Sequence, residues 1–437
     1  MKLTTSYGVS FKDGYSAVKQ TIDIYRSAVE YLFIPIADNW DEIKVIKGAK
    51  SRQRYVERLV HSCKGRDAQY DFDERFYKLP SYFRRAAITD AIGCYSSYRT
   101  NHDNWEQTHE GKEPKLGVDY HTLPCFYRDN MFVQTGVYTA KIKVYRSNDW
   151  VWQDIRLKKT DVDYLFKRTR DRYVTVNAPV IEKHYGHYEL RFTLTENVEF
   201  ADKPIEDRKV CAVDLGVNTD AVCSVLDVRG TVLARKFITC GREKDSVRNA
   251  LHAVSRFQHG HGSHDSGKLW AVAKNRNLNL GHLIAHRIVD FAVANDCDVI
   301  VFEHLDTAGK KHGSRKQRLH HWKHQAIQKT AESLAHRYGI RISRVCAWNT
   351  SRLAYDGSGR ISRGEEVSKE TPYDVCKFNN GKICNCDLNA SYNIGARYFL
   401  RALIKEKPQV MAEVPDLGSG TQRVLADLWR AGAAVFA

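Results

Sequence analysis

Three acidic residues have the settings needed for metal-ion chemistry, because each ends an apolar stretch or directly follows one. Asp214 closes the stretch VCAVD, Glu303 closes VIVFE, and Asp387 opens the predicted helix DLNASYNIGARY. An ionised carboxylate at the edge of a core is costly unless it is paired or bound to a metal. Mg²⁺ prefers oxygen ligands, and two ions about 4 Å apart suit phosphodiester hydrolysis. We therefore predict that Asp214, Glu303 and Asp387 are catalytic and bind two Mg²⁺ ions, for which Mn²⁺ is expected to substitute.

Each acid also has an ordinary structural explanation. Asp387 is at a position where a residue often caps a helix, and Glu303 could form an ion pair with a basic side chain. These alternatives are about as frequent as the catalytic one for any single acid. The prediction of a metal site therefore depends on the order and the settings of the three acids together.

The elements around these acids alternate between strands and helices. Residues 209–216 form a nearly continuous apolar strand, and two further strands, 219–227 and 231–238, follow it. A long helical stretch ends in an amphipathic part, 280–295, and leads to the apolar strand 298–306. A further helix and the strand 340–348 come next. This order predicts an α/β sheet with helices packed on it, and such sheets bind ligands at their strand ends.

The N-terminal half has a different pattern. Residues 1–10 alternate like an edge strand, 11–105 have helical periodicity, and 115–200 alternate apolar with polar residues. The last stretch predicts a small antiparallel barrel or sandwich. If the strand at 1–10 belongs to it, the helical block is an insertion.

The net charge of +16 points to a polyanionic partner, although solubility alone would also explain it. Basic residues after Glu303 face few acids and alternate with histidine and tryptophan, which is typical of a surface that follows a phosphate backbone. A solvated helix face would normally carry interspersed glutamates. The predicted nucleic-acid-binding residues are Lys310, Lys311, Arg315, Lys316, Arg318, Trp322, Lys323, Arg352 and Arg360.

The stretch from about 205 to 400 resembles the RuvC domain of the TnpB family of transposon-encoded RNA-guided nucleases and of the miniature type V CRISPR effectors derived from them. The matching pieces are 213–222, 301–306, 349–351 and 387–397. The resemblance implies that Asp214, Glu303 and Asp387 bind the catalytic Mg²⁺ ions. It also implies a multidomain α+β chain, in which a RuvC/RNase H-like α/β nuclease domain follows an oligonucleotide-binding wedge β-barrel with an inserted helical recognition lobe.

The domains expected from this resemblance have the following bounds. The wedge barrel comprises 1–10 and 106–205, the recognition lobe 11–105, the nuclease domain 206–405 and a C-terminal tail 406–437. Family members usually carry a zinc ribbon within the part that corresponds to 349–386. Here the first cysteine pair is replaced by RLAYDGSGR, and Cys376, Cys384 and Cys386 remain. Zinc needs four tetrahedral ligands, so we predict a degenerate, metal-free insertion and do not expect zinc.

The predicted function is that of an RNA-guided DNA endonuclease. Its expected partners are double-stranded target DNA and a guide RNA, either a transposon-end RNA or a CRISPR RNA with a scaffold. No apolar run is long enough to cross a membrane, so we expect a cytoplasmic protein, and a monomer rather than a dimer. The alternatives are a nuclease-inactive RNA-guided repressor and an unguided RNase H-like nuclease or transposase.

Overall fold

The computed structural model describes residues 1–437 except 120, 171–173, 185, 201, 262–264, 306–322, 413, 415–416, 418 and 437. The chain divides into two compact units, one formed by Lys2–Asn197 and the other by Val198–Ala437 together with Met1. Within the described residues, no helix is both long enough and apolar enough to span a lipid bilayer.

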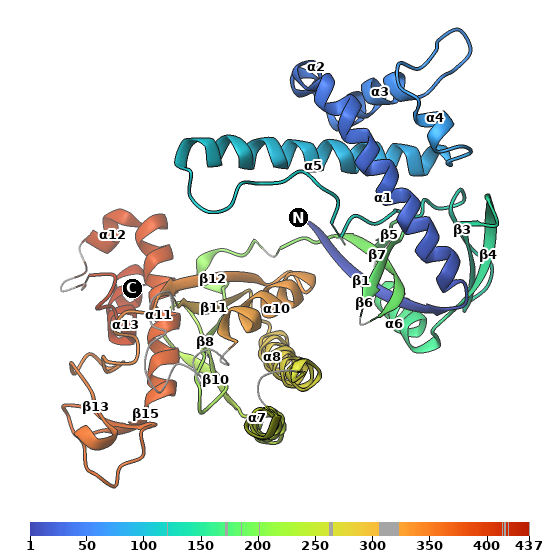
Figure 1. Ribbon diagram of the computed structural model, residues 1–437. Helices are drawn as coiled ribbons and strands as arrows, with labels where there is room; N and C mark the ends of the chain where they lie inside the picture. Colours follow the sequence, from blue (N-terminus) through green and yellow to red (C-terminus); the bar gives the residue numbers. More distant parts are fainter. Residues whose placement is uncertain are drawn as a thin grey trace. The chain divides into compact units, whose positions relative to one another are not determined.

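The first unit combines helices with one antiparallel sheet (Figure 1). Its helices are α1 (Tyr15–Asp38), α2 (Trp40–Val45), α3 (Ala49–Val60), α4 (Phe72–Arg75), α5 (Ser81–Thr108) and α6 (Lys159–Thr169). Its strands are β1 (Lys2–Lys12), β2 (Phe132–Gln134), β3 (Thr139–Arg146), β4 (Asp149–Leu157), β5 (Val174–Val176), β6 (Val180–His184) and β7 (His187–Asn197). The predicted helical block and the predicted antiparallel strands are thus confirmed as secondary structure.

A single hydrophobic core joins the helices of this unit to its sheet. Along α1, residues at helical spacing are buried, and Tyr25 and Leu32 are among them. The hydroxyl oxygen of Thr21 in α1 accepts a hydrogen bond of 2.8 Å from the backbone N–H of Tyr145 in β3. In β7, buried and half-buried residues alternate, as expected for a sheet with one covered face.

Along residues 2–10, β1 pairs with β7 alone among the described strands, as predicted for an edge strand. Only its last two residues, Phe11 and Lys12, pair with β4, which places β1 between β4 and β7 in the sheet order. Both partners are distant in sequence, so the local alternation of β1 carries no sign of them. The strands predicted for 115–200 did not include the helix α6. This helix is short, and Val162 is its one fully buried residue, so its sequence carries little helical periodicity.

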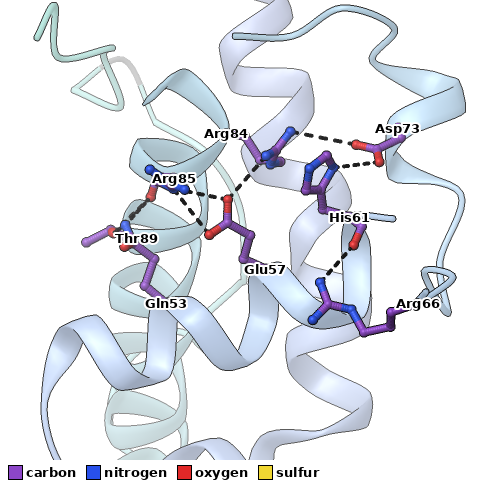
Figure 2. Close-up of polar contacts among 8 residues, drawn as sticks. All are labelled: Gln53, Glu57, His61, Arg66, Asp73, Arg84, Arg85 and Thr89. Atoms are coloured by element: carbon purple, nitrogen blue, oxygen red, sulfur yellow. Dashed lines mark hydrogen bonds and ion pairs between the residues drawn. The ribbon is translucent and has the colours of Figure 1, made fainter. Parts of the chain in front are cut away.

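Two ion pairs, of which the one with Arg84 is largely buried, connect α3 to α5 in the helical layer (Figure 2). Glu57 Oε1 lies 3.2 Å from Arg84 Nη2 and 3.1 Å from Arg85 Nε. Beside this cluster, His61 Nδ1 lies 2.7 Å from Asp73 Oδ2. Each acid of the cluster therefore has a basic neighbour.

The second unit contains a five-stranded mixed sheet in the order β10-β9-β8-β11-β12. Its strands are β8 (Val210–Asp214), β9 (Ala221–Leu226), β10 (Val232–Ile238), β11 (Val299–His304) and β12 (Arg341–Cys346). Its helices are α7 (Gly241–His261), α8 (Gly267–Ala294), α10 (His324–Arg337), α11 (Cys386–Glu406), α12 (Pro408–Ala412) and α13 (Leu425–Phe436), with short 3₁₀ turns at Ile205–Asp207 and Gly364–Glu366. The predicted α/β sheet is confirmed.

Separate cores cover the two faces of this sheet. On one face, α11, α12 and α13 pack against residues that include Ala212 and Val301. On the other face, α8 and α10 pack against residues that include Val213 and Phe302. The central strands are buried on both sides, which explains their continuous apolar sequence. The segment 406–437, for which the sequence suggested no role, contributes α13 to the first core.

A small sheet precedes α11, with the order β13 (Ser362–Arg363), β14 (Val375–Lys377) and β15 (Ile383–Asn385). It lies within the predicted insertion 349–386. Its own cluster of buried residues includes Cys376 and Cys386.

Candidate active site

Asp214 and Glu303 stand at the carboxyl ends of the adjacent parallel strands β8 and β11. Val213 pairs with Phe302 in the register of these strands, so the two acids occupy the next positions along each strand. Side chains alternate between faces, and Ala212 and Val301, two residues earlier, face α11. Both acids therefore point to the face of the sheet that α11 covers.

Asp387 comes to the same place from the first turn of α11. The helix cap is Asn385, whose Oδ1 accepts hydrogen bonds of 3.0 Å from the backbone N–H groups of Asp387 and Leu388. Because Asn385 caps the helix, Asp387 is not the capping residue. A Cβ atom added to Gly216, just after β8, would lie 3.8 Å from Asp387 Oδ2. The third acid thus lies beside the end of the strand that carries Asp214.

Burial raises the pKa values of all three carboxylates, and at Asp214 the other two acids add to this effect. Burial raises the pKa of Asp214 well above its ordinary value, and the charges of Glu303 and Asp387 raise it further. Burial also raises the pKa of Glu303 and that of Asp387. Glu303 is buried, whereas Asp214 and Asp387 are half-buried and so remain partly accessible. None of the three forms an ion pair within 4.0 Å with a residue that the structure describes.

Hydrogen bonds fix the position of Glu303. The Thr350 hydroxyl donates a hydrogen bond to Glu303 Oε1. Gln328 Nε2 donates a bond of 3.0 Å to the backbone carbonyl of Glu303. Nearby, the charge of Arg397 lowers the pKa of Glu303 and partly offsets the effect of burial. The sequence analysis did not identify Gln328 or Arg397 as part of the site.

Polar residues at four-residue spacing along α11 hold the surrounding loops. Asn389 and Asn393 both donate 2.9 Å hydrogen bonds to the carbonyl of Leu353, and Asn393 also donates to that of Thr350 at 3.0 Å. Arg397 donates to the carbonyls of Cys346 and Trp348 at 2.7 and 2.8 Å. All three side chains are buried. Their spacing of four residues was a signal in the sequence that could have revealed them.

Arg363 is the cation that most directly opposes the acids. Its charge lowers the pKa values of both Asp214 and Asp387. The guanidinium lies 4.2 Å from the centroid of the Tyr373 ring. Its buried Nε has no hydrogen-bond partner among the described residues. No sequence pattern distinguished Arg363 from other arginines, so the prediction named Arg352 and Arg360 instead.

The predicted nucleic-acid-binding residues are only partly described. Arg352 and Arg360 are exposed on the loop before β13, where residue 360 forms an isolated bridge with Leu353. Lys323 is half-buried and precedes α10. The remaining predicted residues lie outside the described part of the chain: Lys310, Lys311, Arg315, Lys316, Arg318 and Trp322.

Two of the three cysteines of the insertion donate hydrogen bonds to backbone carbonyl groups, and the third, Cys384, supplies one of these carbonyls. Cys376 Sγ donates a 3.3 Å hydrogen bond to the carbonyl of Cys384, and Cys386 Sγ donates one of 3.6 Å to that of Tyr373. Burial and a hydrogen bond to Cys386 raise the pKa of the Cys376 thiol, the hydrogen bond more strongly. The absence of zinc remains a prediction.

The donor chemistry of the acidic cluster fits divalent metal ions. Three carboxylates offer the oxygen ligands that Mg²⁺ prefers, and burial raises the pKa of each, so a bound cation would favour their ionised forms. In the described part of the chain, only His102, Asp103 and Glu106 place three ligand atoms within 4.8 Å of one another.

Comparison with known proteins shows the fold. The chain is similar in structure to Cas12f1, determined by cryo-EM in a complex with sgRNA and target DNA, with a TM-score of 0.53 and 16% sequence identity. The match covers 86% of this chain and 81% of that chain. The chain therefore has a mixed α/β fold of the Cas12 effector type. The predicted likeness to type V CRISPR effectors is confirmed for the fold, and the likeness to TnpB stays a prediction.

Other comparisons add less. CasPhi-2 (Cas12j) bound to crRNA matches with a TM-score of 0.48 and 10% identity, over 92% of this chain and 98% of that chain, which is too distant to support an argument. A family model described as the Aq_aa04 family matches residues 5–146, about a third of the chain and all within the first unit. No curated protein matches the sequence.

Proposed function

We propose that the protein is an RNA-guided DNA endonuclease that cuts through a single Mg²⁺-dependent RuvC-like site. The observation that carries this proposal is the convergence of Asp214, Glu303 and Asp387 on one face of the second sheet, without ion-pair partners among the described residues. The shared fold supports it, since the Cas12f1 structure is a complex with sgRNA and target DNA.

The residues of the site divide the work of phosphodiester hydrolysis. Asp214, Glu303 and Asp387 would hold the metal. Bound Mg²⁺ supplies a more acidic water and positive charge for the phosphate oxygens. Thr350 holds the Glu303 carboxylate in one orientation through its hydroxyl. Arg363 brings a positive charge close to the acids, where it would attract a phosphate of the DNA strand.

The rest of the chain would hold the guide RNA and the target. We propose that 1–10 and 106–205 act as the wedge and 11–105 as the recognition lobe, and that the net charge of +16 serves a bound guide–target duplex. The protein would then read only a short motif beside the target, while base pairing selects the sequence. We place it in the cytoplasm, with either a transposon-end RNA or a CRISPR RNA as its guide.

A plasmid assay tests this proposal against its two rivals. The protein is purified with its co-expressed RNA and offered plasmids with a guide-matched or unmatched site beside a randomised flank, in Mg²⁺. We expect cutting that needs both the RNA and the match. Tight matched binding without cutting would instead identify a nuclease-inactive repressor. Cutting without RNA would identify an unguided nuclease or transposase and overturn the guided function.

A further inference from the structure

A cavity of about 680 Å³ lies beside the acidic cluster in the second unit. It is an open pocket lined by the turn after β8, by α7 and α8, and by the start of α10, and its size falls within the range of small-ligand sites. Gly216 lines it, and the same glycine borders Asp387, with only 3.8 Å between the Cβ position and Asp387 Oδ2. Gly216 therefore belongs both to the lining of the cavity and to the surroundings of Asp387, although none of the three acids lines the cavity.

The walls and the rim of this cavity differ in chemistry. The walls are largely aliphatic: Val247, Leu251, Leu280, Ile284 and Ile327 line them. Among these apolar residues stands the amide of Asn277, which is 7% exposed. Such a wall suits a flat, largely apolar group.

The rim carries excess positive charge. Asp220 is the acid in the lining, and Lys244 Nζ lies 2.9 Å from its carboxylate. Lys244 also donates to the carbonyl of Val217 at 3.3 Å, so it neutralises Asp220 and holds the turn. Two further cations of the lining are Lys323 and Arg248, and Nη1 of Arg248 lies 4.0 Å from Asp245 Oδ1 at the exposed surface. An anion with a flat apolar part, such as a nucleotide, matches this combination of wall and rim.

We propose that the cavity takes an unpaired base of the DNA strand that is being cut, close to the phosphate at Asp387. This inference rests on the proposed function, because it assumes that DNA lies at the acids. A base can enter only when it is unstacked and unpaired, and separating it from a duplex costs free energy. The cavity would therefore make the site selective for single-stranded DNA, with Arg248 and Lys323 holding the neighbouring phosphates.

The test combines a filled cavity with DNA that lacks one base. In Ser255→Trp, an indole enters the cavity from an exposed position on α7, which leaves the core intact. The matched control is Asn279→Trp, at an exposed position on α8 that does not line the cavity. The guided complex of each protein is given target DNA with an abasic site at each nucleotide beside the cut phosphate in turn, and the cutting rates are compared.

For the unaltered protein and for Asn279→Trp, we expect an abasic site at one position to slow cutting about tenfold, the size of one lost base contact. Ser255→Trp should cut intact DNA about tenfold more slowly and show no further loss with the abasic site. Equal rates for intact and abasic DNA in the unaltered protein would overturn the proposal. So would an abasic effect that persists unchanged in Ser255→Trp.

A second measurement separates this inference from the proposed function. If the guided complex does not cut matched DNA, the proposed function fails, and the cavity is tested in the RNA-free chain with Ca²⁺. The probe is a single-stranded oligonucleotide that carries 2-aminopurine. We expect a change in its fluorescence that Asn279→Trp retains and Ser255→Trp removes. If binding produces no such difference between the two variants, the cavity does not take a base.

Discussion

The helical layer of the first unit and the acidic cluster of the second unit both bury carboxylates, but they balance the charge differently. Glu57 has Arg84 and Arg85 within 3.2 Å, and Asp73 has His61 within 2.7 Å (Figure 2). Asp214 has instead two further carboxylates as its main charged neighbours, and they raise its pKa. A protein that gained nothing from this repulsion would be more stable without it.

The comparison distinguishes a structural acid from a functional one. Where the partner of a carboxylate is supplied by the chain, as at Glu57, the charge holds helices together. Where acids from distant parts of the chain converge without an ion pair within 4.0 Å among the described residues, a bound cation would supply the missing positive charge. Loss of a carboxylate should therefore reduce stability at Glu57, and activity rather than stability at Asp214.

The largest effect is expected for Asp214→Asn. Loss of partners that only orient metal ligands costs about 10–100-fold, so loss of a ligand itself should reduce guided cutting by more than about 100-fold. Binding of matched DNA should be unchanged, because the cut site contributes little to holding the duplex. Cutting is measured on labelled plasmid and binding by filter retention. Cutting that remains within tenfold of the unaltered protein would exclude Asp214 from the site.

The next largest effect is expected for Glu57→Gln, and it concerns stability. Arg84 and Glu57 are only 8% and 14% exposed. The substitution removes the nearer counter-charge of this buried guanidinium and leaves only Asp73, whose Oδ1 lies 3.9 Å from Nη1. Breaking a buried pair in this way costs roughly 3 kcal/mol. Denaturant unfolding of the helical unit, followed by circular dichroism, measures this loss. An unchanged midpoint would mean that the pair does not support the α3–α5 contact.

Thr350→Val should have a smaller effect on the acidic cluster. The substitution keeps the shape of the side chain but removes the hydroxyl that donates to Glu303. We expect metal affinity to fall about tenfold, as for other groups that orient a ligand, so cutting should recover at higher Mg²⁺ concentration. Ser391→Ala is the control, since its 2.6 Å contact is with Ser224. If added Mg²⁺ does not restore cutting in Thr350→Val, the hydroxyl has another role.

The pH dependence of metal-free stability should also distinguish the two clusters. The pKa of Asp214 in the folded protein lies above its ordinary value of 3.8. At low pH the folded and unfolded chains are both protonated, and as pH rises the unfolded chain ionises first, so stability falls through the raised pKa. The difference amounts to about 1.4 kcal/mol for each pKa unit.

Thermal unfolding in EDTA between about pH 4 and pH 8 measures this effect. Asp214→Asn should lose less stability than the unaltered protein over that range, and Mg²⁺ should stabilise only the unaltered protein strongly. Identical pH profiles for the two proteins would contradict the repulsion inferred at the acids.

Local patterns in the sequence were sufficient for part of the site. Asp214 and Glu303 end apolar runs, and such runs mark buried strands whatever their partners are. The convergence of these acids with Asp387, by contrast, depends on the parallel pairing of β8 with β11 and on the contact of α11 with the sheet. The pattern within each segment does not show which segments meet in space. The prediction that the three acids converge therefore depended on the order of the motifs along the chain.

Two features could not be predicted because they depend on long-range contacts. Arg363 lies in a segment without periodicity, and only the folded chain brings its charge near Asp214 and Asp387. The strand β1 has an ordinary alternation, and the pairing of its last two residues with β4 could not be read from it. For the tail 406–437 the sequence suggested no role, and the packing of α13 beside α11 became visible only in the folded chain.

The smallest effect is expected for Arg85→Ala. This substitution allows an exposed and a buried ion pair of the same carboxylate to be compared. Arg85 bonds to the same carboxylate as Arg84 but is 46% exposed, against 8% for Arg84. Because water screens an exposed pair, its removal should cost less than about 1 kcal/mol. Arg84→Met should cost several times more, since it leaves Glu57 without its buried partner. Equal losses of unfolding free energy in Arg85→Ala and Arg84→Met would show that burial does not decide the strength of these ion pairs. Structural and functional acids would then differ only in the number of their basic partners.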